Sequence, residues 1–251
     1  MPPSPLKKLH RPTGGGGGAC DRFAWRGVNP KATSVDDGQA MRALILSALS
    51  ALTLSTQAWA GDLSVMVRNA AGQPVKDAVV TLKPASGGAG GAPIKFTWPY
   101  SVAQQNISFN PFVLIVPVGS NVNFPNKDNV RHHVYSFSPT KKFELKLNGR
   151  DESRSVLFDK AGVVALGCNI HDQMIAYVVV VDTAYAAKTG ADGVALIRNA
   201  PAGNAAMTVW QPYMKTARNQ LVKTIAVPAA GGRQDISVDL RPAPGAMGMI
   251  H

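Results

Sequence analysis

Three residues of the chain could bind one metal ion together. Cys168, His171 and Met174 follow one another at three-residue intervals. A thiolate, an imidazole and a thioether suit copper, in the arrangement of two histidines, one cysteine and a long axial methionine bond. All three can face one ion if a strand ends at Cys168, a tight loop follows and a new strand begins at Ile175. The spacing therefore predicts a copper site and requires a second histidine from elsewhere.

Two adjacent histidines, His132 and His133, can supply that second ligand. They lie on a different predicted strand, well upstream of Cys168. The residue types alone leave both histidines open. Each side chain taken singly also has a purely structural alternative. Cys168 can be a buried inert thiol, Met174 a core residue that fills a gap, and His171 a loop histidine with its hydrogen bonds made. The combination favours the metal.

The start of the chain has the features of export. Residues 1–40 carry a glycine run and scattered prolines with no apolar period, and we expect a disordered or mis-annotated leader there. A signal peptide is predicted over residues 41–60, because Met41 and Arg42 precede a short apolar run and a small-x-small box ends at Ala60. Removal of residues 1–60 also removes Cys20. Cys168 is then the sole thiol of a protein sent to an oxidising compartment, which favours burial or ligation.

The composition favours an all-β protein. The 24 glycines and 18 prolines, with no long helical period, indicate many short strands and turns. The net charge is +11, but it comes without a basic stripe or stacking aromatics, so nucleic acid is not expected as a partner. No membrane span is expected after signal cleavage, because no later segment is apolar for long enough.

Seven short strands are predicted between residues 112 and 181, at a spacing typical of a β-sandwich or barrel. The last of them is Ile175 to Val181, and its run from Tyr177 to Val181 is apolar on both faces, as expected of a central strand covered on both sides. This series contains both histidines and the Cys168 loop. Strand and turn signals also flank it, from Leu63 to Leu82 and from Val194 to Leu240.

Residues 94–182 resemble the cupredoxins, the plastocyanin-like and amicyanin-like blue copper proteins. The Cys-x-x-His-x-x-Met spacing is similar to that of the amicyanin group, and the stretch from Asn126 to Val134 matches the pattern Asn-x-Asp-x-x-x-His-x-Val. The resemblance implies a Greek-key β-sandwich with copper bound by His132, Cys168, His171 and Met174. His133 stays an alternative to His132, because it shares a strand face with the aromatic residues that follow.

The loop departs from that group at two places. Asp172 stands where amicyanin-like loops have proline, and Ala176 stands where they have glycine. These changes keep the four ligands but alter the surface beside the exposed ligand, where a partner protein would dock.

The flanking segments resemble the small prealbumin-like sandwich known as the carboxypeptidase regulatory-like domain. Its first half has the pattern D-x-x-G-x-P-V-x-x-A-x-V, which residues 69–80 follow with Asn69 in place of the aspartate. The resemblance implies one small β-sandwich made from residues 61–85 and 186–241 and interrupted by the cupredoxin domain. Two unpaired β segments are the alternative. Residues 242–251 are expected to be a disordered tail.

Together these features predict a periplasmic, monomeric one-electron carrier with one type 1 copper ion. The resemblance implies a redox partner protein, either a dehydrogenase or a cytochrome. No enzymatic activity is expected, because only one mononuclear site is visible. The alternatives are a periplasmic copper-binding protein for metal delivery or storage, and a metal-free envelope β-sandwich that serves as a binding module.

Overall fold

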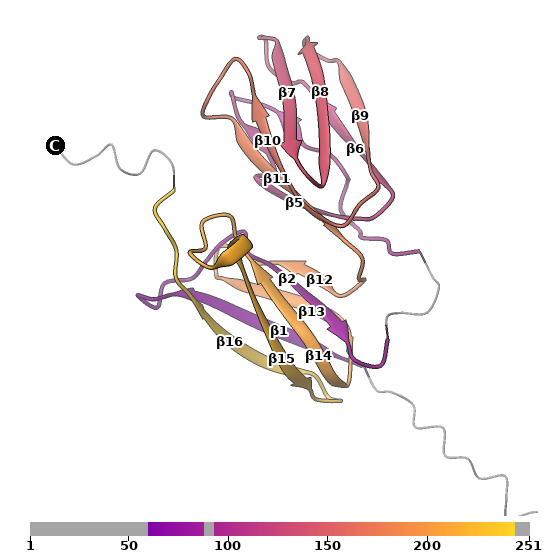
Figure 1. Ribbon diagram of the computed structural model, residues 1–251, viewed down its shortest axis with the longest axis vertical. Helices are drawn as coiled ribbons and strands as arrows, with labels where there is room; N and C mark the ends of the chain where they lie inside the picture. The colour runs from indigo at the N-terminus through magenta and orange to yellow at the C-terminus, as the bar shows by residue number, and fades with distance from the viewer. Residues whose placement is uncertain (1–59, 88–92, 244–251) are drawn as a thin grey trace, which may run out of the picture. The chain divides into compact units, whose positions relative to one another are not determined.

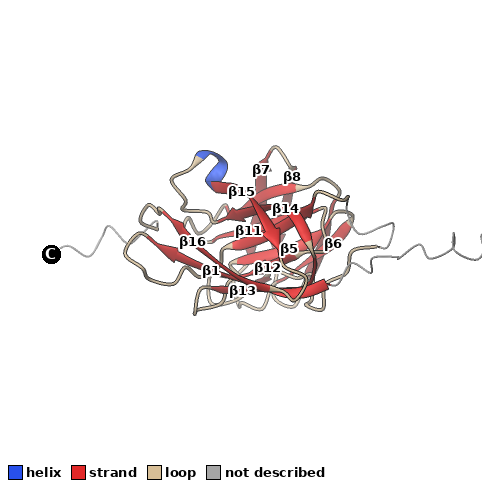
Figure 2. Cartoon of the chain, turned by 90° about the horizontal axis from the view of Figure 1, so that it is seen from below, coloured by secondary structure: helices blue, strands red, loops and turns tan. Residues whose placement is uncertain are grey.

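The computed structural model describes residues 60–87 and 93–243, and these are almost entirely β-strands and turns (Figure 1). The described part of the chain contains one short helical turn, Ala217–Asn219, drawn in blue among the red strands of Figure 2. The expectation of an all-β fold is confirmed. The expected leader, the tail from residue 244 and all of the predicted signal peptide except Ala60 lie outside the described residues.

The middle of the chain forms a five-stranded sheet with the order β5-β11-β10-β7-β8. Only β5 and β11 run parallel, and the other neighbours are antiparallel. The strands are β5 (Val113–Pro117), β7 (His132–Ser138), β8 (Lys141–Asn148), β10 (Gly162–Cys168) and β11 (Ile175–Val181). Two smaller pairs accompany this sheet: β3 (Ala103–Gln104) with β4 (Phe109–Asn110), and β6 (Ser120–Pro125) with β9 (Ser153–Phe158).

The alternation of side chains decides which residues of this sheet face its core. Along β10, Val164, Leu166 and Cys168 are buried in one cluster, and Val134 of β7 joins it. His132 shares the buried face of β7 with Val134, since residues two apart in a strand point the same way. Cys168 pairs with Val134 across the strands. Both donors are thereby placed on the inner face, at one end of the sheet.

The central strand β11 is covered on both faces, as its sequence predicts. Val178 and Val180 belong to the core cluster just described, whereas Val179 and Val181 pack into a second cluster with Trp210. Trp210 belongs to the C-terminal flank. One face of the sheet is therefore closed by residues that come from outside the middle segment.

The two flanking segments pair with each other in two sheets, β13-β1-β16 and β12-β2-β14-β15. Side chains from both flanks share one core cluster. The strands are β1 (Ala60–Asn69), β2 (Val79–Pro84), β12 (Ala186–Lys188), β13 (Val194–Pro201), β14 (Gly203–Trp210), β15 (Gln220–Val227) and β16 (Gly232–Val238). From this pairing we infer one sandwich that the middle segment interrupts. Its membership of the carboxypeptidase regulatory-like family stays a prediction.

Within the described residues, we find no helix with the length and apolar character needed to cross a membrane.

Candidate metal centre

The predicted donors come from two strands, β7 and β10, and from the loop that follows β10. His132 is the first residue of β7, and Cys168 is the last residue of β10. His171 and Met174 lie in the loop that joins β10 to β11. This loop turns tightly, because the N–H of Met174 donates to the carbonyl of His171 at 3.0 Å. The N–H of Asn169 also donates to the carbonyl of His133 at 3.0 Å, which ties the loop to β7.

The structure brings His132, Cys168 and His171 together. The Sγ of Cys168 lies 3.8 Å from Nδ1 of His132 and 3.9 Å from Nδ1 of His171. One donor atom from each residue lies within 4.8 Å of the other two. Cys168 and His132 are fully buried, and His171 is partly exposed. Residues distant in sequence thus form a cluster of two nitrogens and one sulfur, with one imidazole near solvent.

These distances fit a metal ion between the three donors. A divalent metal ion such as zinc bonds sulfur at about 2.3 Å and nitrogen at about 2.0 Å. With a sulfur–metal–nitrogen angle near 120°, the sulfur and nitrogen atoms then lie about 3.7 Å apart. The observed separations of 3.8 and 3.9 Å are close to that value. A trigonal plane of one thiolate and two imidazoles is the donor set of blue copper sites. The spacing of this cluster therefore fits a metal ion, and its donor set favours copper.

His133 lies outside the cluster. Its Nε2 is 2.7 Å from Oε1 of Glu144 on the neighbouring strand β8. It occupies the opposite face of β7 from His132, together with Tyr135 and Phe137. The cluster therefore contains His132 and not His133, and the assignment of His132 as the metal ligand stays a prediction.

Asp128 orients the buried His132 through Nε2, the ring nitrogen that does not face Cys168. Its Oδ2 lies 2.8 Å from Nε2 of His132, and the carboxylate also accepts from the backbone N–H groups of Asn106 at 2.6 Å and Ile107 at 3.0 Å. Burial raises the pKa of this carboxyl, but the bonds it accepts outweigh burial, so its pKa lies below the usual value. An ionised Asp128 accepts a hydrogen bond from Nε2–H of His132, which leaves the ring's lone pair on Nδ1, facing Cys168.

A buried asparagine holds the loop that carries Asp128. The side-chain amide of Asn126 donates to the carbonyls of Val130 and Asn148, each at 2.8 Å. Its Oδ1 accepts from the backbone N–H of Asp128 at 2.9 Å. Asn126 and Asp128 are part of the pattern from Asn126 to Val134, but their residue types alone assign neither a function. The four-residue spacing between Asp128 and His132 was the signal that could have found the pair.

Met174 is buried in the same core cluster as Cys168, with 1% of its surface exposed. Its side chain is therefore kept from solvent. Its function as the axial ligand stays a prediction. In the same loop, Ile170 is 49% exposed and Asp172 is also exposed, so the exposed side chains next to His171 in the sequence are one apolar and one acidic.

Comparisons with known proteins find copper proteins among the similar solved structures. No protein-family model and no curated protein matched it. Among solved structures, a purple cupredoxin from Nitrosopumilus maritimus matches with 22% identity over 32% of this chain and 98% of its own, at a TM-score of 0.30. An oxidised amicyanin variant matches with 22% identity over 42% of this chain and 99% of its own, at a TM-score of 0.31.

A copper-containing nitrite reductase from Thermus scotoductus also matches, with 26% identity and a TM-score of 0.32. That match covers 47% of this chain and only 28% of the reductase. TM-scores this low do not define a function for the chain. The chemistry of the site depends instead on the cluster of His132, Cys168 and His171.

Proposed function

We propose that this protein binds one type 1 copper ion through His132, Cys168, His171 and Met174 and acts as a one-electron carrier. The observation that carries the proposal is the convergence of two Nδ1 atoms on the Cys168 sulfur, at 3.8 and 3.9 Å. Copper bound in such a set would supply a centre that gains and loses one electron. The protein's own part is to hold the donors in a nearly fixed arrangement.

The surroundings of the cluster support electron transfer. His132 is fully buried and oriented by Asp128, so its ring has little freedom to move. The Cys168 sulfur lies in the core, where water is excluded. His171, partly exposed at the loop surface, is the donor through which an electron would pass to a partner. No substrate reaction of the protein's own is proposed.

The cellular setting is part of the same proposal. The predicted signal peptide would send the chain to the periplasm, where a dehydrogenase or a cytochrome would be the redox partner. A monomer is proposed, and neither nucleic acid nor membrane takes part.

Copper delivery or storage is the second candidate, and the partial exposure of His171 favours it. A ligand within reach of solvent could be exchanged for a ligand of a receiving protein. Delivery predicts rapid loss of copper to a competing chelator, whereas a carrier retains its metal through many cycles of oxidation and reduction.

Copper(II) titration of the purified protein tests the proposal. A type 1 site would give an intense thiolate-to-copper visible band at one copper per chain, with narrow hyperfine splitting in the EPR spectrum. Cys168→Ser should abolish the band, and His132→Gln should weaken copper binding at least tenfold. His133→Gln is the matched control, because His133 contacts Glu144 instead, and it should leave the band unchanged.

A pale, ordinary copper spectrum would contradict the carrier. Equal effects of the two histidine substitutions would contradict the assignment of His132.

A further inference from the structure

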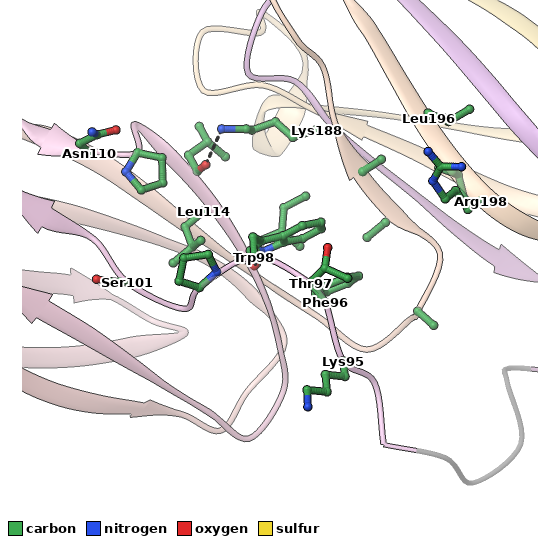
Figure 3. Close-up of a pocket in the computed structure, with 18 of the residues that line it drawn as sticks. Lys95, Phe96, Thr97, Trp98, Ser101, Asn110, Leu114, Lys188, Leu196 and Arg198 are labelled. Carbon is green, nitrogen blue, oxygen red and sulfur yellow. Dashed lines mark hydrogen bonds between the residues drawn. The ribbon is translucent and has the colours of Figure 1, made fainter.

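A large pocket lies beside β5, and none of the three clustered donors lines it. Its walls come from the segment at residues 95–101, from β5, and from β12 and β13 of the flanking sandwich (Figure 3). The cavity volume is about 1090 Å³. Small-molecule sites typically have about 300–1,000 Å³. The pocket is therefore large enough for an occupant of several linked units.

The charge of the lining is entirely positive. Among the described lining residues there are four cations and no acidic side chain, the cations being Lys95, Lys127, Lys188 and Arg198. Lys188 is already bonded, since its Nζ lies 3.0 Å from Oδ1 of Asp77. Arg198 forms one ion pair, with Asp62, and both side chains are so exposed that the pair contributes little free energy. Lys95 and Lys127 form no ion pair within the described residues. The pocket therefore favours a ligand with negative charge.

A rigid aromatic surface forms part of one wall. The rings of Phe96 and Trp98 are stacked, with centroids 4.5 Å apart and planes 7° from parallel. The indole N–H of Trp98 donates to the carbonyl of Ile115 at 2.8 Å, and the N–H of Phe96 donates to the hydroxyl of Tyr100 at 2.9 Å. The Trp98 ring is thus held by its own hydrogen bond and the Phe96 ring by stacking on it, while Trp98 remains 36% exposed. Such a surface suits the flat face of a ring.

Neutral polar side chains complete the lining. They offer hydroxyls and amides, which both donate and accept hydrogen bonds, and include Thr97, Ser101, Asn110 and Asn199. Sugar rings need this combination, because they present an apolar face for stacking and hydroxyl groups at their edges. A carboxylate on the sugar would in addition bond the free lysines. Single-stranded nucleic acid fits less well, since its phosphates need a continuous track of cations.

We propose that this pocket binds an acidic oligosaccharide, with a sugar ring on the Phe96–Trp98 surface and its carboxylates toward Lys95 and Lys127. Because the pocket does not include the metal donors, binding should be the same with and without copper. The proposal is therefore independent of the electron-carrier function.

Calorimetric titration with a galacturonic acid trimer tests the proposal, with cellotriose as the neutral probe and a thymidine hexanucleotide as the nucleic-acid probe. The acidic trimer should bind at least tenfold more tightly than cellotriose, and its affinity should fall as salt rises. Lys127→Gln and Phe96→Leu should each weaken its binding at least threefold. The matched control is Lys223→Gln, which removes an exposed charge outside the pocket.

Equal binding of the acidic and neutral trimers would overturn the proposal, and so would tighter binding of the hexanucleotide. A loss with Lys223→Gln as large as that with Lys127→Gln would also overturn it, because attraction to the net positive charge would then explain the affinity.

Discussion

Replacing Asp128 by asparagine tests how the protein prepares His132 for a metal. The carboxylate accepts three hydrogen bonds, from His132, Asn106 and Ile107. An asparagine keeps one oxygen, but its NH₂ group cannot accept a bond from a backbone N–H. At least one bond to a charged acceptor is therefore lost, and such bonds contribute about 1.5–3 kcal/mol each.

Copper affinity should fall about 10- to 100-fold in Asp128→Asn, as is typical when the partner of a ligating histidine is removed. This range corresponds to about 1.4–2.7 kcal/mol, which agrees with the loss of one such bond. The assay is competition for copper(II) against a chelator of known affinity. Nitrogen NMR of the metal-free protein should also show that the proton of His132 no longer resides mainly on Nε2.

Asp172→Asn is the matched control, because it removes the same charge from the residue that follows His171. The side chain of Asp172 is exposed and makes no hydrogen bond to His132 or His171 in the described structure. Its copper affinity should stay within about threefold of the unmodified protein. Equal losses in the two variants would refute the reasoning, because the field of a nearby carboxylate would then account for the effect. Unchanged affinity in Asp128→Asn would refute it as well.

Three further substitutions have outcomes that follow from the packing. In Gly167→Ala, the added Cβ would lie 2.7 Å from Cζ of Tyr135, so the ring must shift, and urea unfolding should show a loss of about 1–3 kcal/mol. Asn126→Ala removes the donor to one buried and one partly buried carbonyl, and it should lower the free energy of unfolding by about 2–4 kcal/mol, together with copper affinity. In Gly193→Ala, the alanine would have to adopt a φ of +76°, and its Cβ would lie 2.7 Å from the carbonyl oxygen of Val67. Calorimetry should therefore show a lower melting temperature, with the visible copper band unchanged. A wild-type unfolding curve for any of the three would contradict the contacts described.

The local part of the site was predictable because its signal is local. Cys168 and His171 are three residues apart in one loop, and that loop begins where the sequence indicates the end of a strand. The alternation of apolar and polar side chains along the strand could not show whether His132 or His133 lies in the cluster. The buried face of β7 carries Ser136, whereas its outer face carries Tyr135 and Phe137, which is the reverse of the usual pattern.

The other features depend on contacts between distant segments. Asp128 reaches His132 through a loop whose course is set by the buried amide of Asn126. The parallel pairing of β1 with β16 joins residues near 65 to residues near 235, and no local pattern specifies such a partner. The short strands β3 and β4 were also not predicted, because two residues give no recognisable period.

The pairing of β1 with β16 has a consequence for the order in which the chain can fold. During synthesis the N-terminal residues emerge first, so all four proposed ligands are available once residue 174 has emerged. Strand β11 completes their sheet soon afterwards. The first strand, by contrast, waits with one edge unpaired until the last strand emerges. Metal capture could therefore precede completion of the molecule, and a cut just before residue 232 would leave β1 open to other chains while sparing the ligands.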